Sequence, residues 1–248
     1  MKLSYKFKSS DSTKKAPVIL IHGTGSHGEM WQAQTRLLND HGHPCLTIDL
    51  RGHGESLEPG DKADLNTHIL DVIETLEASQ IPMPAIFVGH SLGAIISLKI
   101  AQSHPQYTKT IFLAALPGRV LPAVAHSFRW FLSKPYEILK GGHLHSALPF
   151  RGKALLDTHS NSLQEIVNNF ESIDLTRELF EIDCPAHLSA GRFDPVAPYM
   201  YMKKVQKNIR NSTLTIFDLG GHNFMDYYTN SFNRWILDNL PSETVENS

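Results

Sequence analysis

The chain has 248 residues, of which 41% are hydrophobic and 19% are charged, and its formal net charge at pH 7 is -2. This composition excludes a disordered chain, and the small net charge excludes a broad basic face for nucleic acid or anionic lipid. The longest apolar region, 85–101, is interrupted by His90, Ser91 and Lys99, so we expect no stable membrane insertion. Because the N-terminus lacks the apolar core of a signal peptide, we expect a cytoplasmic protein, and the oligomeric state is left open.

In chain order, short runs rich in β-branched residues alternate with longer stretches of helical periodicity. The first strand is expected within 1–8, and the apolar runs predict further strands at 18–21, 45–48, 86–88, 110–114, 186–190 and 214–217. Apolar residues at helical spacing predict helices at 30–38, 65–76, 94–101 and 232–236. This alternation is typical of a mostly parallel central sheet flanked by helices, so the predicted fold class is α/β.

The stretch 117–181 departs from this alternation. It contains no convincing strand, but its apolar spacing predicts one helix at 121–132 and another at 163–170. Helix-breaking residues separate the two: Pro135, Gly141, Gly142 and Pro149. We therefore expect a core formed by 1–116 and 182–248, with a helical cap of residues 117–181 inserted after the sixth strand.

The sequence Gly89-His90-Ser91-Leu92-Gly93 matches the pattern G-x-S-x-G between a predicted buried strand and an apolar helix. In this context the serine lies on a sharp strand-to-helix turn that exposes its hydroxyl at the edge of the sheet. Because a five-residue pattern with three fixed positions arises readily by chance, its position between strand and helix carries most of the weight. The pattern predicts that Ser91 is a catalytic nucleophile.

A serine nucleophile needs a base to take its proton and an acid to orient that base. The chain has 14 histidines, so position decides among them: His222 follows the last predicted strand, and Asp194 follows the strand before it. Both lie past the carboxyl ends of parallel strands, where open α/β sheets build their sites. We therefore predict a catalytic triad of Ser91, Asp194 and His222.

Five motifs occur in a fixed order along nearly the whole chain. They are His22-Gly23, Asp49-x-Arg51-Gly52-x-Gly54, Gly89-x-Ser91-x-Gly93, Gly191-x-x-Asp194 and Gly221-His222. In these motifs the sequence resembles the α/β-hydrolase superfamily, in its branch of small cap-bearing serine esterases and C–C hydrolases. The resemblance implies an oxyanion hole formed by the backbone N–H groups of Thr24 and Leu92. His22 is interpreted as a hydrogen-bonded structural residue.

The inserted segment is expected to cover the site, and several large side chains are predicted to bind the substrate: Met30, Trp31, Phe128, Phe131 and Tyr136. The pairs His41-x-His43 and His143-x-His145 lack the further ligands of a metal site, so we expect no metal and no cofactor. Between Gly118 and Ser160, six basic residues stand against two acidic ones, which would suit a carboxylate-bearing substrate or a solvated helical face equally.

The leading functional hypothesis is hydrolysis of a carboxylic ester of a small, largely apolar molecule through an acyl-enzyme. A thioesterase could use the same triad, and so could a cofactor-free C–C hydrolase or lyase of the menaquinone-pathway type. A ligand receptor that retains the triad is an alternative of another class. Haloalkane dehalogenases and epoxide hydrolases of this fold use an aspartate at the position of Ser91, which argues against those two reactions.

Overall fold

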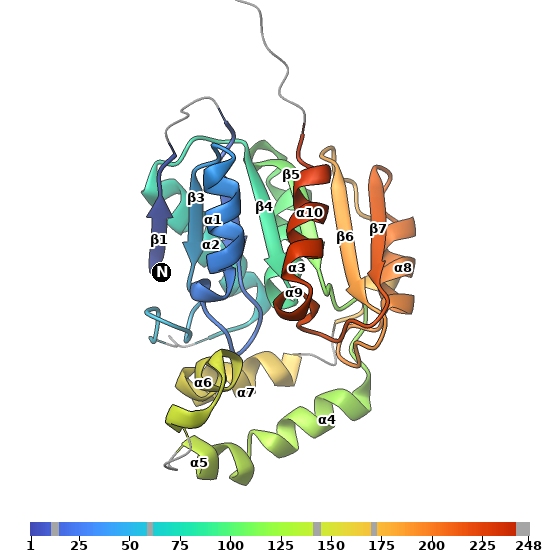
Figure 1. Cartoon of the computed structure of the whole chain (residues 1–248). Helices are drawn as coiled ribbons and strands as arrows, with labels where there is room; N and C mark the ends of the chain where they lie inside the picture. The colour runs from blue at the N-terminus through green and yellow to red at the C-terminus, as the bar shows by residue number, and fades with distance from the viewer. Residues whose placement is uncertain (11–14, 59–61, 141–144, 170–172, 242–248) are drawn as a thin grey trace, which may run out of the picture.

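The computed structural model describes residues 1–10, 15–58, 62–140, 145–169 and 173–241. A seven-stranded sheet forms its centre, in the order β1-β3-β2-β4-β5-β6-β7 (Figure 1). The strands are β1 (Tyr5–Lys8), β2 (Val18–Ile21), β3 (Cys45–Ile48), β4 (Ala85–His90), β5 (Thr108–Ala114), β6 (Ala186–Gly191) and β7 (Ser212–Phe217). All neighbouring strands pair in parallel except β1, which runs antiparallel to β3. The predicted α/β class with a mostly parallel sheet is confirmed.

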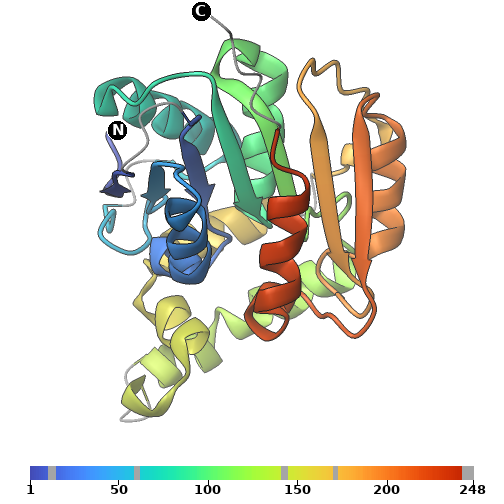
Figure 2. The same cartoon turned by 45° about the horizontal axis from the view of Figure 1, so that its top comes forward.

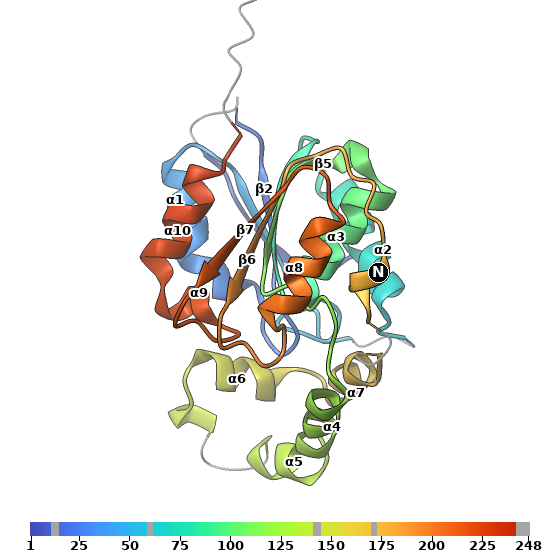
Figure 3. The same cartoon turned by 90° about the vertical axis from the view of Figure 1, so that its right-hand side faces the viewer.

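Helices cover both faces of the sheet. Figure 3 shows α1 and α10 on one face and α2, α3 and α8 on the other, and Figure 2 shows α1 beside α10. The helices that flank the sheet on its two faces are α1 (Gln32–Asp40), α2 (Leu65–Ser79), α3 (Leu92–Ser103), α8 (Tyr199–Lys207), α9 (Phe224–Tyr227) and α10 (Thr229–Asp238). Short 3₁₀ helices occur at η1 (Gly28–Trp31), η2 (Pro105–Tyr107), η3 (His145–Ala147) and η5 (Leu175–Arg177). Of the described helices, none is long and apolar enough to cross a membrane.

The protein has two hydrophobic clusters, one on each face of the sheet, because the central strands are buried on both faces. Along β2, Ile19 and Ile21 join the cluster beneath α2 and α3, whereas Val18 and Leu20 join the cluster beneath α1 and α10. Side chains alternate across a strand, so a strand covered by helices on both sides is apolar at every position. This explains why the central strands appear in the sequence as continuous apolar runs.

A helical insertion, defined here as α4 to α7, lies across the edge where the parallel strands end (Figure 1). Its helices are α4 (Pro122–Phe131), α5 (Lys134–Lys140), α6 (Phe150–Asp157) and α7 (Ser160–Asn169). It is attached to the segment between β3 and α2, where the His159 N–H donates to the Gly52 carbonyl and the Ala63 N–H donates to the Glu165 carboxylate. The insertion therefore faces the edge of the sheet that carries the predicted site.

One part of the sequence prediction needs correction. Five strands of the described chain precede α4, so the insertion follows the fifth strand and not the sixth. The runs predicted as strands before residue 117 also number five, so the prediction counted one strand too many.

Candidate active site

Ser91 lies on a strained turn between β4 and α3. Its backbone has φ 52° and ψ -111°, a positive-φ conformation that non-glycine residues rarely adopt. The turn is tight because its flanking glycines touch backbone: a Cβ at Gly89 would lie 2.3 Å from the Gly93 carbonyl oxygen, and one at Gly93 would lie 2.2 Å from that of Ile21. Glycine at both positions lets strand and helix approach closely enough to hold the serine in this conformation.

Ser91, His222 and Asp194 form a continuous hydrogen-bonded chain. The His222 Nε2 lies 3.2 Å from the Ser91 Oγ, and the His222 Nδ1 lies 2.8 Å from Asp194 Oδ2. The other carboxylate oxygen of Asp194 accepts the N–H groups of Val196 and Ala197, each at 2.8 Å. These bonds leave Asp194 Oδ2 to accept the Nδ1–H of His222, so the Nε2 lone pair faces the serine hydroxyl. The structure thus brings the three predicted residues together.

The loops that carry Asp194 and His222 are bonded to one another. The Phe193 N–H donates to the Gly220 carbonyl at 2.8 Å, and Gly191 contacts the same loop so closely that a Cβ would lie 2.4 Å from the Gly221 oxygen. An exposed ion pair between Arg192 and Asp218 also joins the two loops. The acid and the base are therefore positioned as a single unit at the carboxyl ends of β6 and β7.

His90, which directly precedes Ser91, contacts His222. Its Nε2 lies 3.1 Å from the His222 carbonyl oxygen and donates a hydrogen bond to it, and the two rings are 4.9 Å apart. Burial, and then the neighbouring His222, hold the pKa of His90 well below its usual value. His90 is therefore a neutral imidazole that supports the backbone of His222.

The predicted oxyanion donors lie on two segments that meet beside Ser91. A Cβ at Gly23 would be 2.7 Å from the His90 ring and 3.0 Å from Ser91 Cβ, so the loop after β2 passes directly over the nucleophile. Among the described residues, the backbone N–H groups of Thr24 and Leu92 have no hydrogen-bond partner. Two N–H groups of this kind next to a serine can donate hydrogen bonds to the oxyanion of a tetrahedral intermediate.

Two buried histidines hold this loop against the loop after β3. His22 donates from Nδ1 to the Gly23 carbonyl at 2.8 Å and accepts the Leu50 N–H at Nε2, also at 2.8 Å. His53 donates from Nδ1 to the Arg51 carbonyl at 2.8 Å and accepts the Gly25 N–H at 3.0 Å. Both rings must be neutral to donate and accept in this way.

Burial keeps the two rings uncharged. Burial lowers the pKa of His53 to about 3, and burial together with the nearby His53 holds the pKa of His22 well below its usual value. The sequence indicated a structural role for His22 and assigned none to His53. The available signal for His53 was its position within the motif from Asp49 to Gly54.

The loop after β3 is held by its own charges. Asp49 accepts the N–H groups of Gly28 and Glu55 at 2.6 and 2.9 Å, and the Arg51 guanidinium bonds both carboxylate oxygens of Asp71 at 2.7 Å. These contacts form a rigid base under the loop that carries Thr24.

The predicted pocket residues divide into two groups. Met30, Phe128 and Phe131 are partly buried at the junction of core and insertion, and the Met30 sulfur lies 3.5 Å from the Arg151 guanidinium. Trp31 is fully buried and stacks on Phe232, with ring centroids 6.4 Å apart. Tyr136 is also fully buried, and its hydroxyl donates to the Thr158 carbonyl at 2.8 Å.

Trp31 and Tyr136 are therefore packing residues rather than pocket walls, which corrects the prediction. Trp31 belongs to the cluster beneath α1 and α10, and Tyr136 bonds within the insertion itself. Burial raises the pKa of Tyr136 to about 12, so its hydroxyl remains a donor.

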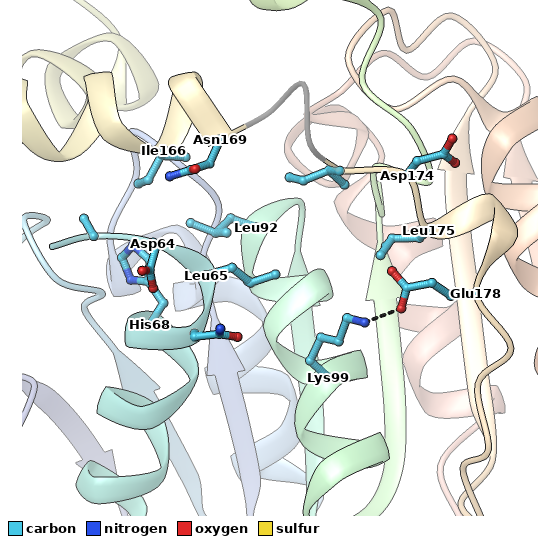
Figure 4. Close-up of a pocket in the computed structure, with 13 residues that line it drawn as sticks. Asp64, Leu65, His68, Leu92, Lys99, Ile166, Asn169, Asp174, Leu175 and Glu178 are labelled. Carbon is cyan, nitrogen blue, oxygen red and sulfur yellow. Dashed lines mark hydrogen bonds and ion pairs between the residues drawn. The ribbon is translucent and has the colours of Figure 1, made fainter.

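A cavity of about 380 Å³ lies between the insertion and the core beside the residue that follows the nucleophile (Figure 4). Its walls come from α2, α3, α7 and the segment around η5. The lining residues are Ala63, Asp64, Leu65, Asn66, His68, Leu92, Lys99, Ile166, Asn169, Ile173, Asp174, Leu175 and Glu178. Small-molecule sites commonly occupy such junctions.

Arg151 joins the insertion to the core at the rim of the site. From α6 it makes two bonds of 2.7 and 2.9 Å to the Asp226 carboxylate on α9, and it lies 3.3 Å from the Ser26 hydroxyl. Sequence reasoning counted Arg151 as one of six basic residues without a role. Within the described residues, no group of three or more His, Cys, Asp or Glu side chains is arranged to hold a metal ion.

Comparisons with known proteins agree with this geometry. The sequence profile of the alpha/beta hydrolase family matches residues 18–228. The AB hydrolase superfamily protein YisY of Bacillus subtilis is 25% identical, over 83% of this chain and 84% of its own. The pimeloyl-[acyl-carrier protein] methyl ester esterase of Neisseria meningitidis is 26% identical, over 86% and 88% of the two chains.

A solved hydrolase from Pseudomonas aeruginosa superposes with a TM-score of 0.82 at 24% identity, covering 97% of this chain and 94% of its own. At this identity the superposition establishes the fold. The family profile covers most of the chain together with the serine turn and both loops of the site. The chain therefore belongs to the alpha/beta hydrolase family and is a hydrolase.

Proposed function

We propose that the protein is a serine hydrolase that cleaves a carboxylic ester of a small, largely apolar substrate through an acyl-enzyme intermediate. The observation that carries this proposal is the hydrogen-bonded chain from Asp194 through His222 to Ser91, with distances of 2.8 and 3.2 Å. A serine hydroxyl becomes nucleophilic when an oriented imidazole can take its proton, and this chain supplies that orientation.

In the first step, the Ser91 Oγ attacks the ester carbonyl carbon while His222 Nε2 takes the hydroxyl proton. Asp194 accepts the Nδ1–H of His222 and stabilises the imidazolium that forms. The carbonyl oxygen becomes an oxyanion, which the N–H groups of Leu92 and Thr24 would bind. His222 then returns the proton to the alcohol as the C–O bond breaks, leaving the acyl group on Ser91.

In the second step, water replaces the alcohol. His222 takes a proton from the water as its oxygen attacks the acyl carbonyl carbon, and the same two N–H groups would stabilise the second oxyanion. Breakage of the bond to the Ser91 Oγ, with return of the proton, releases the acid and restores the hydroxyl.

The helical insertion would act as the cap over this site. Its α6 contributes the Arg151 contact to Asp226, and Leu155 lies against Gly25 of the loop that follows β2. A cover of this kind excludes bulk water from the acyl-enzyme and strengthens the electrostatic interactions within the site. The Neisseria relative, a pimeloyl-[acyl-carrier protein] methyl ester esterase, supports an ester as the substrate class.

The test is hydrolysis of a p-nitrophenyl ester series of increasing acyl length by the wild type and by Ser91→Ala. We expect turnover that peaks at one acyl length and falls to background in Ser91→Ala, while the circular dichroism spectrum is unchanged. Activity retained in Ser91→Ala would contradict the assignment of the nucleophile. Thioester cleavage with no oxyester cleavage would replace the ester by a thioester at the same triad.

The lyase and receptor alternatives predict other results, which are measured with other ligands alongside the ester series. Turnover of a carboxylate-rich C–C substrate without ester cleavage would favour the lyase. Two of the six basic residues between Gly118 and Ser160 are already paired, which weakens the support for that alternative: Arg151 bonds Asp226, and Arg119 lies 3.9 Å from Asp174. Absence of turnover together with ligand-dependent binding of a partner would favour the receptor.

A further inference from the structure

The guanidinium of Arg151, in the first turn of α6, makes five polar contacts, all with residues of the core. Its Nε and Nη2 bond the two carboxylate oxygens of Asp226 at 2.7 and 2.9 Å, and its Nη1 lies 3.3 Å from the Ser26 Oγ. The other two contacts are to thioether sulfurs, of Met30 at 3.5 Å and of Met225 at 3.7 Å. Because a guanidinium has five N–H donors in one rigid plane, these contacts fix both its place and its orientation.

The contacts of Arg151 join the two segments that would act on the reacting ester. Ser26 lies in the loop after β2 that carries the proposed donor Thr24 (residues 22–27, the oxyanion loop). Asp226 lies in α9, four residues after His222. One side chain of the insertion therefore bonds the oxyanion loop and the segment after the proposed base at the same time.

Two neighbours of Arg151 on α6 pack against the same loop. Leu155 lies so close to Gly25 that a Cβ there would be 2.5 Å from the leucine Cδ1. The ring of Phe150 lies 4.9 Å from that of His27, edge to face. With the Arg151 contact, α6 touches three consecutive residues of the loop, 25–27, directly after the proposed donor. Because the two buried histidines hold this loop from the core, α6 holds its other side.

The contact between Arg151 and the oxyanion loop is shielded from water. Ser26 is 2% exposed and the Arg151 side chain is 21% exposed. A hydrogen bond from a charged donor in such a place is stronger than one between neutral groups in water. Besides burial and His222, the Arg151 charge lowers the pKa of His90, the residue before Ser91, so its field reaches the nucleophile turn.

We propose that Arg151 is a positioning residue of the Ser91 site, which holds the oxyanion loop through Ser26 and the segment after His222 through Asp226. The proposal rests on the proposed function, because an oxyanion hole belongs to that reaction. The oxyanion exists only in the tetrahedral species, so displacement of the loop costs stabilisation of the transition state more than binding of the substrate.

The first measurement is of kcat and KM on the full-length protein, with the p-nitrophenyl ester that the wild type cleaves best. We expect Arg151→Ala to lower kcat by about 30-fold with a much smaller change in KM. Lys153→Ala removes a positive charge from the same helix and is expected to keep the wild-type kcat. Equal losses in the two variants would overturn the proposal.

Ser26→Ala removes the hydroxyl that Arg151 contacts and leaves the guanidinium in place. It is expected to lower kcat by about threefold in the wild type and to have no further effect in Arg151→Ala, because both changes break one contact. A Ser26→Ala loss of the same size in both backgrounds would contradict a role of Arg151 through Ser26.

A pair of ketones distinguishes positioning from a merely structural role. The Ser91 Oγ would add to 1,1,1-trifluoro-2-octanone and form an oxyanion, whereas 2-octanone resembles the unreacted substrate. The ratio of the two inhibition constants is insensitive to the fraction of folded enzyme. We expect Arg151→Ala to weaken the trifluoroketone as much as it lowers kcat/KM and 2-octanone far less, with Arg151→Lys intermediate. An unchanged ratio in Arg151→Ala would overturn the proposal.

Labelling with a fluorophosphonate separates failure of this proposal from failure of the proposed function, because its P=O oxygen would use the same oxyanion hole without any ester. If esters are not cleaved but Arg151→Ala slows labelling of Ser91 relative to Lys153→Ala, the positioning role stands and the substrate class must be revised. If esters are cleaved and kcat is unchanged in Arg151→Ala, the proposed function stands and Arg151 only fastens the insertion to the core.

Discussion

The Nδ1 of His22 lies 2.8 Å from the carbonyl oxygen of Gly23 and donates a hydrogen bond to it. The carbonyl of Gly23 and the N–H of Thr24 belong to one planar trans peptide group, so they point in opposite directions. The bond to His22 therefore fixes the direction of the Thr24 N–H, which we propose as an oxyanion donor. His53 holds the next N–H along the loop, that of Gly25.

Replacing His22 is expected to impair catalysis more than substrate binding. In His22→Ala the Gly23–Thr24 peptide loses its anchor, so we expect kcat for a p-nitrophenyl ester to fall by about 10²-fold, with a much smaller change in KM. His43→Ala is the matched control, because His43 is also buried and bonds a backbone carbonyl, that of Ala16. Equal losses of kcat in both variants would show that His22 contributes only general stability.

Asp194→Asn is expected to lower kcat by about 10³- to 10⁴-fold while leaving the protein folded. One side-chain oxygen would still accept the Val196 and Ala197 N–H groups, so the new amide NH₂ would face His222. The imidazole would then carry its proton on Nε2, where it cannot accept the Ser91 hydroxyl proton. Asp238→Asn, at an exposed carboxylate at the end of α10, should keep nearly full activity, and an equal loss there would contradict this mechanism.

The strained backbone of Ser91 predicts that stability and activity oppose each other at this position. Because φ is 52° and ψ is -111°, Ser91→Gly should be more stable than Ser91→Ala by about 1 kcal/mol, since glycine tolerates positive φ and alanine does not. Both variants lack the hydroxyl, so the comparison isolates the backbone. Urea unfolding of the two proteins measures the difference, and a less stable glycine variant would show that the turn is not strained.

The buried neutral histidines predict a loss of stability in acid. His53 has a pKa of about 3 in the folded protein, so between pH 6.5 and 3 the unfolded chain takes up a proton that the folded chain does not. The free energy of unfolding therefore falls as the pH drops through this window, by about 1.4 kcal/mol per pH unit for one such group.

His53→Gln removes this titration while its amide can still donate and accept. Urea unfolding at pH 7.5, 5.5 and 4.5 should show a shallower pH dependence in the variant than in the wild type, with the two differing least in slope above pH 6.5. Parallel pH profiles would mean that His53 does not resist protonation in the folded state.

The strands, and the three residues that the structure brings together as Ser91, His222 and Asp194, could be located from sequence because local pattern and chain order agree. Apolar runs such as 18–21 are diagnostic when a strand is covered on both faces, and the glycines beside Ser91 are required by backbone contact. Positions past the strand ends then selected His222 from many histidines. Each of these features depends on neighbouring residues in the chain, where sequence patterns are most informative.

The insertion was less predictable, because the residues that break helices also begin them. Pro135 interrupts the pattern in the sequence but lies in the first turn of α5, and Pro149 directly precedes α6. Proline is tolerated at both positions because the first helical N–H groups need no partner within the helix. The sequence therefore predicted two helices where the described residues of the insertion form four, α4 to α7.

The sequence also could not predict in which direction the side chains near the site point. Met30 and Trp31 are neighbours, yet Trp31 is fully buried in the cluster beneath α1 and α10, whereas Met30 is only partly buried against it. Arg151 gave no signal either, because its contacts with Ser26 and Asp226 join residues that are far apart in the chain.

The central claim is that Ser91 is a nucleophile activated by His222, and labelling with a fluorophosphonate followed by intact-mass and peptide mass spectrometry tests it most directly. We predict one adduct per chain, on the peptide that contains Ser91, formed rapidly in the wild type, slowly in His222→Ala and not at all in Ser91→Ala. Rapid labelling in His222→Ala, or an adduct on another residue, would contradict the account.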